Sequence, residues 1–179
     1  MIIGLSGYAQ SGKDSTAELL CLNYGYRRIA FADAMREALL TLNPKLDSIT
    51  HVSDLVNDYG WDVAKKNPEV RRLLQVLGTD VGRRMFGENF WINIALSGIK
   101  SEDKVVVSDV RFPNEGDAIK ALSGSLWRIN RHNHSAVNGH KSEHAMDNYM
   151  FSHVIYNDGT LDDLSDEVFM LAKELGLGS

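Results

Sequence analysis

The residues best suited to chemistry lie near the start of the chain, in the segment Gly7-Tyr8-Ala9-Gln10-Ser11-Gly12-Lys13-Asp14-Ser15. Its spacing is G-x-x-x-x-G-K, and it lies between an expected strand at 1–6 and an expected helix at 12–23. The glycines let the backbone turn so that successive N–H groups bind phosphate oxygens. The helix directs its positive N-terminus at the same anion. This context predicts a phosphate-binding loop, and it disfavours the alternative of a glycine-rich turn without a ligand.

Eight residues of this loop are expected to bind a nucleotide phosphate or its metal ion. Lys13 supplies a mobile positive charge for the β- and γ-phosphates and is a predicted catalytic residue. Asp14 stands where the usual pattern has a Ser or Thr whose hydroxyl binds Mg²⁺. A carboxylate is still a hard oxygen ligand for Mg²⁺, directly or through water, and Ser15 remains able to bind an α-phosphate. The predicted ATP-binding residues are Gly7, Ala9, Gln10, Ser11, Gly12, Lys13, Asp14 and Ser15.

A second acid and a basic residue follow the clearest strand of the sequence, at 104–109. This apolar, β-branched run is typical of the centre of a parallel sheet. Ligands bind at the carboxyl ends of such strands, so Asp109 is predicted to reach the Mg²⁺ shell, with a helix cap or a salt bridge as the alternative. Arg111 overhangs the same edge, and its guanidinium fork matches phosphate geometry. Arg111 is therefore predicted to bind the acceptor phosphate and to take part in catalysis.

Further candidates for the acceptor site lie in the long helical region. Asp33 follows an expected strand at 28–31 and is either an Mg²⁺ or substrate contact or the N-cap of the next helix. Arg36 lies one helical turn further on. The arginines of residues 71–84 would singly be solvated surface charges, but Arg83 is predicted to hold the acceptor phosphate. The predicted substrate-binding residues are Asp33, Arg36, Arg83, Trp91, Arg111 and Glu143.

The segment 131–148 is polar and rich in histidine, and it is predicted to be a loop or a mobile flap. Arg131 opens it and is the third predicted catalytic residue, because a closing arginine can stabilise the charge that phosphoryl transfer spreads over the equatorial oxygens. Arg128, on the preceding strand, is the alternative source of that charge. The histidines of the flap lack a zinc spacing, so we expect them to be solvated, with His140 ordering the flap or touching substrate.

Short apolar runs alternate with helical patterns along the chain, which indicates an α/β fold. Further helices are expected after Asp33, near 52–59, from 68, from 90 and at 115–122, and an amphipathic helix is expected to end the chain. Further strands are expected at 125–130 and 152–156.

Composition excludes several classes of protein. The chain has 179 residues, 44% hydrophobic and 24% charged, which is typical of one soluble globular domain. Its single cysteine favours a reducing compartment, and neither a secretion signal nor a membrane-spanning run is visible. We therefore expect a cytoplasmic protein without a membrane partner. The net charge of −5 argues against a nucleic-acid polymer as partner.

Taken together, these motifs resemble the phage-encoded deoxynucleoside monophosphate kinases, a branch of the P-loop NMP kinases. In that group an Asp after the loop lysine is usual, so Asp14 supports the resemblance. The segments that carry it, in order, are 7–15, Phe31-Ala32-Asp33, Leu74-Gln75-Val76-Leu77-Gly78-Thr79-Asp80 continuing to Arg83, Ser108-Asp109-Val110-Arg111-Phe112-Pro113-Asn114-Glu115, His140-Lys141-Ser142-Glu143 and Asn157-Asp158-Gly159-Thr160.

The resemblance implies a three-layer α/β/α kinase with a central parallel sheet. Its core would comprise about 1–32, 102–130 and 149–179, with a helical NMP-binding insert at about 33–101 and a lid at about 131–148. It implies ATP as co-substrate, Mg²⁺ as cofactor, a deoxynucleoside monophosphate as acceptor, a homodimer and the host cytoplasm. Alternatives are a kinase for another phosphorylated metabolite, resembling phosphomevalonate or dephospho-coenzyme A kinases, and a non-catalytic ATP-binding regulator.

Overall fold

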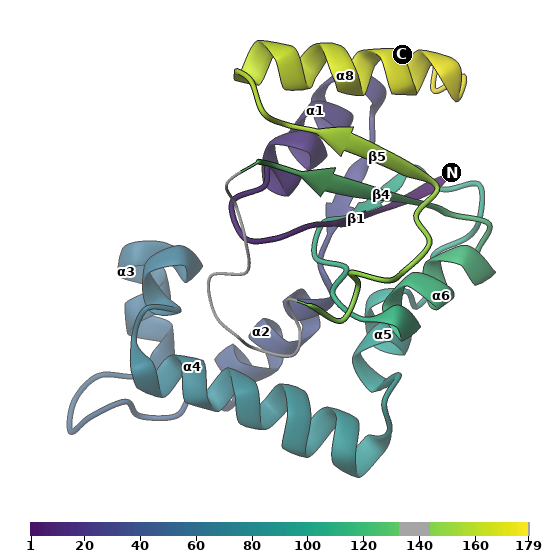
Figure 1. Cartoon of the computed structure of the whole chain (residues 1–179). Helices are drawn as coiled ribbons and strands as arrows, with labels where there is room; N and C mark the ends of the chain where they lie inside the picture. The colour runs from purple at the N-terminus through teal and green to yellow at the C-terminus, as the bar shows by residue number, and fades with distance from the viewer. Residues whose placement is uncertain (133–143, 179) are drawn as a thin grey trace. The chain divides into compact units, whose positions relative to one another are not determined.

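A five-stranded sheet with the order β2-β3-β1-β4-β5 forms the centre of the fold (Figure 1). The structure is a computed structural model that describes residues 1–132 and 144–178. Every neighbouring pair of strands is parallel. This arrangement confirms the α/β class and the central parallel sheet. The strands are β1 (Ile2–Ser6), β2 (Arg27–Ile29), β3 (Val105–Val107), β4 (Ser125–Asn130) and β5 (His153–Tyr156).

The side chains of β1 show how helices cover both faces of the sheet. Side chains alternate across a strand, and Ile3 and Leu5 pack into one core with α1 (Lys13–Tyr24) and α8 (Leu161–Glu174). Gly4, between them, faces the opposite side. A Cβ there would come within 2.6 Å of the Ile119 side chain in α6 (Pro113–Ala121), so a larger residue would force that side chain to move. The sheet is therefore the middle of three layers.

The chain divides into two compact units, one of Met1–Ala30 with Gly98–Ser179 and one of Phe31–Ser97. The second unit is helical and has its own small core, which includes Leu39, Val52 and Val70. Its boundaries lie close to those expected for the insert, while its role in acceptor binding stays a prediction. Its helices are α2 (Phe31–Leu42), α3 (Val52–Ala64), α4 (Pro68–Gln75), η1 (Val76–Phe86) and α5 (Phe90–Ala95).

Two expectations about the start of α2 are wrong. Strand β2 ends at Ile29, and the helix already begins at Phe31, so the apolar run at 28–31 is shared between a strand and a helix. Asp33 consequently lies in the first turn of α2 and not at its N-cap. A carboxylate in the first turn still interacts favourably with the helix dipole.

The helices at 52–86 are longer and less regular than expected. α3 continues to Ala64 across a kink at Gly60, where φ is 73°. The helix that begins at Pro68 changes at Val76 into the π-helix η1, which holds the segment Gly78-Thr79-Asp80. Such wide turns are rare and often occur at functional sites. Among the residues that the structure describes, no helix is long and apolar enough to span a membrane.

Candidate active site

The predicted phosphate loop connects the end of β1 to the start of α1. Gly12 precedes the helix with a φ of 106°, which favours glycine, and a side chain there would overlap the amide of Asn157. That amide donates a buried hydrogen bond of 2.9 Å to the carbonyl of Ser11. Asn157 follows β5, so the far edge of the sheet holds the loop in shape. The sequence pattern gave Asn157 only as part of a family segment and not as a contact of the loop.

One hydroxyl inside the loop points to an absent ligand. Ser11 is 1% exposed, and its Oγ has no hydrogen-bond partner among the described residues. Buried hydroxyl groups are normally paired. The N-terminus of the 12-residue helix α1 adds a positive dipole at the same place. An anion bound in the loop would satisfy both features, which fits a phosphate site.

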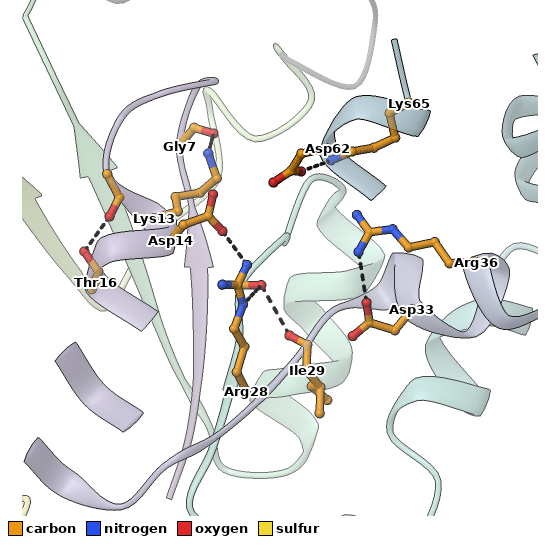
Figure 2. Close-up of polar contacts among 12 residues, drawn as sticks. Gly7, Lys13, Asp14, Thr16, Arg28, Ile29, Asp33, Arg36, Asp62 and Lys65 are labelled. Atoms are coloured by element: carbon orange, nitrogen blue, oxygen red, sulfur yellow. Dashed lines mark hydrogen bonds and ion pairs between the residues drawn. The ribbon is translucent and has the colours of Figure 1, made fainter. Parts of the chain in front are cut away.

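Lys13 is held by the loop itself. Its Nζ donates hydrogen bonds of 2.9 Å and 2.7 Å to the carbonyls of Gly7 and Tyr8, and the first of these is drawn in Figure 2. Burial of the ammonium group lowers the pKa of Lys13 to about 8, because desolvation disfavours the charged form. The ammonium is thus partly removed from water and is hydrogen-bonded to two backbone carbonyls of the loop. A phosphate that replaced those carbonyls would also favour the charged form.

The surroundings of Lys13 include three of the other predicted site residues. Arg111 and Arg128 further lower its pKa by charge repulsion, whereas Asp14 and Asp109 raise it. Charges exert such effects only at short range in a solvated protein. The structure therefore brings Lys13, Asp14, Asp109 and Arg111 together at the carboxyl edge of the sheet and adds Arg128 to them.

Arg111 is positioned through its backbone. The backbone N–H groups of Arg111 and Phe112 donate to one carboxylate oxygen of Glu115, at 2.7 Å and 3.0 Å. Glu115 is 5% exposed and lies in the first turn of α6. It therefore fixes the turn between β3 and α6 and leaves the exposed Arg111 side chain at the sheet edge. Sequence reasoning did not give Glu115 this role.

Arg128 lies in a polar and aromatic cluster next to the loop. It is 8% exposed, and its Nη2 pairs with Oδ1 of Asp147 at 3.1 Å. Its guanidinium carbon lies 4.8 Å from the ring centre of Tyr8 and 5.5 Å from that of Phe151. The Tyr8 hydroxyl donates to the same Asp147 oxygen at 2.8 Å. The only sequence signal for this cluster was an arginine inside the apolar run of β4.

Arg131, predicted to close over the phosphates, lines a cavity of about 340 Å³ beside the loop. The loop and the start of α1 form one wall, and the turn between β5 and α8 forms another. This placement puts Arg131 next to the phosphate loop. Glu143, predicted to bind substrate, lies outside the described residues. The cavity is lined by Gln10, Gly12, Lys13, Asp14, Ser15, Arg131, Asn157, Gly159, Thr160, Leu161 and Leu164.

Asp14, predicted to bind Mg²⁺, pairs through Oδ1 with Arg28 of β2 (Figure 2). Arg28 was not among the predicted site residues. The carboxylate oxygens of Asp14 and Asp109 are hard donors and suit Mg²⁺, which needs one or two carboxylates besides water and phosphate. No cluster of three or more potential metal-binding side chains occurs in the described residues. The donors thus fit a metal that arrives together with a nucleotide.

In the second unit, two predicted substrate contacts form a pair of their own. Asp33 and Arg36 make an ion pair of 3.2 Å, and Arg36 lies 5.8 Å above the ring of Trp61 (Figure 2 shows the ion pair). Trp61 was not predicted. An acid, a guanidinium and an aromatic face are groups that can bind a nucleotide.

Trp91 and Arg83 make contacts within the same unit. Trp91 is 8% exposed, and its indole N–H donates to the carbonyl of Gly78 in η1 at 3.2 Å. Arg83 lies 3.5 Å from a carboxylate oxygen of Glu88. The contacts of Trp91 are those of a packing residue, and its role in substrate binding stays a prediction.

Comparison with known proteins then decides the family. Residues 42–168 match the family described as deoxynucleotide monophosphate kinase. The chain belongs to this family. The match confirms the phage-type resemblance drawn from the sequence and shows a phosphotransferase, for which ATP is the co-substrate. The phosphate loop precedes the matched residues, so the loop and the family match are separate lines of evidence.

Relatives agree with this assignment, and a solved structure agrees with the fold. The chain is 28% identical over 189 residues to a putative deoxynucleotide monophosphate kinase of Acanthamoeba polyphaga mimivirus, covering 94% of each chain. It is 25% identical over 182 residues to the deoxynucleoside-5'-monophosphate kinase of Escherichia phage T5, covering 67% of this chain and 72% of the relative. Dephospho-CoA kinase from Campylobacter jejuni shares the fold, with a TM-score of 0.52 and 13% identity over 97% of this chain and 96% of that one.

Proposed function

We propose that this family member transfers the γ-phosphoryl group of ATP to a deoxynucleoside monophosphate, giving ADP and the diphosphate. The observation that carries the proposal is the position of Lys13. Its ammonium is partly buried at the loop, and the charges of Arg111, Arg128, Asp14 and Asp109 all act on its pKa. A site of this composition is suited to move a phosphoryl group between two bound phosphates.

The donor side would use the loop and the cavity next to it. Backbone N–H groups of the loop and the N-terminus of α1 bind the ATP phosphates. Lys13 exchanges its two carbonyl contacts for oxygens of the β- and γ-phosphates. Arg131 borders the cavity that continues from the loop. It therefore contacts the bound donor, in addition to or in place of the closing role predicted for it.

The acceptor side would use Arg111 and residues of the second unit. Arg111 holds the acceptor phosphate, because its guanidinium can form two parallel hydrogen bonds with it. Asp33, Arg36 and Arg83 contribute from residues 31–97, which act as the NMP-binding insert. The lid at 131–148 and its residue Glu143 lie largely outside the described residues. Closure of such a segment excludes water, which otherwise competes as acceptor.

Asp14 and Asp109 would hold Mg²⁺ directly or through water, while Ser15 would bind an α-phosphate. When bound, Mg²⁺ neutralises charge on the phosphates of the donor. Lys13 and Arg111 provide fixed positive charge on either side of the transferring group, and no covalent intermediate with the protein is needed. Catalysis is therefore positioning together with electrostatic stabilisation. A homodimer, a cytoplasmic location and the absence of a nucleic-acid partner stay predictions.

The experiment is an acceptor panel. The protein is supplied with ATP and MgCl₂ and with each ribo- and deoxyribonucleoside monophosphate in turn, and ADP formation is followed. We expect ADP to form only when an acceptor is present, fastest with a deoxynucleotide. Lys13→Ala should lower kcat by roughly a hundredfold or more while the protein stays folded. ADP formation with phosphorylated metabolites but not with nucleotides would contradict the proposed acceptor, and a folded, fully active Lys13→Ala variant would contradict the proposed site.

A further inference from the structure

Arg28 links the two segments that supply the predicted metal ligands. Its Nη2 pairs with Oδ1 of Asp14 at the start of α1 (Figure 2), and its Nε donates to Oγ of Ser108 at 3.1 Å. Ser108 is 3% exposed, directly precedes Asp109, and has its backbone N–H bonded to the carbonyl of Ile29 at 3.0 Å. One guanidinium therefore ties the side chain of Asp14 to the strand end that carries Asp109.

Asp14 needs such support because of its position. Its side chain is 80% exposed, and it lies in the first turn of α1, where little packs against it. An exposed side chain loses rotamer freedom when it must bind a ligand. Arg28 engages only Oδ1, and Figure 2 shows the other carboxylate oxygen pointing away from Arg28. The contact thus fixes the rotamer of Asp14 while one oxygen remains for another ligand.

We propose that Arg28 is a positioning residue that holds Asp14 in the orientation in which it meets the metal of a metal–nucleotide complex. This inference rests on the proposed function, because it assumes that the loop binds a nucleotide with Mg²⁺. Arg28 acts through Asp14 and does not touch the phosphates. Asp14 stands where a Ser or Thr hydroxyl usually follows the loop lysine. Its carboxylate is longer than that hydroxyl, and Arg28 of β2 holds it in place.

The two contacts of Arg28 define suitable variants. A guanidinium can reach Asp14 and Ser108 at once through different nitrogens, whereas the single ammonium group of lysine cannot span both. Arg28→Lys therefore keeps the positive charge and removes the double contact. Ser108→Ala removes the second anchor without changing any charge. Arg27→Lys is the matched control, because Arg27 is exposed on the same strand and its side chain leaves the opposite face.

The test measures ADP binding by titration calorimetry, once with MgCl₂ and once with EDTA. The readout is the gain, meaning the ratio of the Kd without metal to the Kd with metal. Asp14→Asn should abolish most of the gain. Arg28→Lys and Ser108→Ala should each lower it by roughly two- to fivefold, as expected for a partly exposed ion pair. In both, the affinity for ADP without metal should stay unchanged, and Arg27→Lys should keep the wild-type gain.

A double variant separates positioning from direct contact. In the Asp14→Asn background, Arg28→Lys should cause no further loss of gain, because the residue that it positions is already gone. An equal loss in both backgrounds, a wild-type gain in Arg28→Lys, or weaker metal-free ADP binding in Arg28→Lys would overturn the proposal. A wild-type protein that turns over but binds ADP equally with and without Mg²⁺ would also overturn it. A protein with the expected gains but no transfer to any nucleotide would contradict only the proposed acceptor.

Discussion

Arg128 and Asp147 form an ion pair of 3.1 Å in which the arginine side chain is only 9% exposed. The pair joins β4 to the segment that leads into β5, and Tyr8 of the phosphate loop donates to the same carboxylate. The other carboxylate oxygen of Asp147 lies 2.8 Å from Nδ1 of His144, within hydrogen-bond distance. A buried guanidinium of this kind depends on its carboxylate partner, because a charge away from water needs compensation.

Asp147→Ala is expected to destabilise the protein by about 1–3 kcal/mol, because it leaves the Arg128 guanidinium buried without its partner. Tyr8→Phe removes one neutral donor to the same carboxylate and should cost less, about 0.5–1.5 kcal/mol. Urea unfolding followed by circular dichroism measures both. Asp166→Ala, at an exposed position of α8, is the control and should change stability little. A Tyr8→Phe variant less stable than Asp147→Ala would contradict this account of the cluster.

The lowered pKa of Lys13 predicts an alkaline limit on donor binding. Below pH 8 the free protein carries a charged Lys13, and above it the charge is progressively lost, since the pKa is about 8. Bound phosphates favour the charged form, so kcat should persist to higher pH than kcat/KM for ATP. Rate profiles from pH 6 to 10 test this. Lys13→Arg, if it retains measurable turnover, should lose the alkaline limb, and an equal limb in that variant would assign it to another group.

Arg111 and Arg131 should affect different substrates. Arg131 borders the cavity beside the phosphate loop, so Arg131→Ala is expected to raise the KM for ATP by about tenfold, with a smaller effect on the acceptor. Arg111→Ala should raise the acceptor KM and lower kcat. Arg111→Lys should restore little of the lost acceptor affinity and turnover, because lysine lacks the guanidinium fork. Steady-state kinetics with each substrate varied in turn measures the split. If Arg131→Ala lowers kcat alone, the closing role predicted from the sequence holds instead.

The position of Gly82 in the second unit has no room for a larger side chain. A methyl group at this position in η1 would overlap the indole ring of Trp91, whose N–H is bonded to Gly78. Gly82→Ala is therefore expected to destabilise the protein by about 1–3 kcal/mol through overpacking. Thermal unfolding provides the measurement. Gly178→Ala has open space around its Cβ and is the control. A neutral Gly82→Ala would mean that Trp91 moves easily, and it would then be a poor anchor for η1.

The parts of the site that were predictable from the sequence are local in the chain. The residues of the phosphate loop follow from the spacing of a short motif, and Asp109 follows from the apolar run directly before it. Neither prediction needs any partner that is distant in the sequence. The partners that complete the site are distant. Asn157 reaches Ser11 across 146 positions, and Arg28 reaches Asp14 across 14 positions in another element. No periodicity or spacing encodes such pairs, because they depend on which strands are neighbours.

The boundary errors have a similar origin. The run at 28–31 contains residues that suit either a strand or a helix, and only pairing with β3 decides that the strand ends at Ile29. Leu74, Leu77 and Val81 recur at a spacing that is typical of an α-helix. This spacing therefore did not indicate that α4 changes at Val76 into the π-helix η1. Trp91, which lies outside this helix, donates a hydrogen bond to the carbonyl of Gly78 within it.

The order of the strands in the sheet has a consequence for how the chain reaches its native state. β1 precedes the other four strands in the chain, yet it lies at the centre of the sheet and pairs with residues 105–107 and 125–128. At about 5–20 residues per second, a ribosome needs roughly 5–20 s to supply those partners. Meanwhile residues 31–97, whose core is assembled from helices near one another in the chain, are able to collapse first. The strand that leads into the phosphate loop is thus made well before the strands that pair with it, and during that interval its apolar residues are open to chaperones or to aggregation.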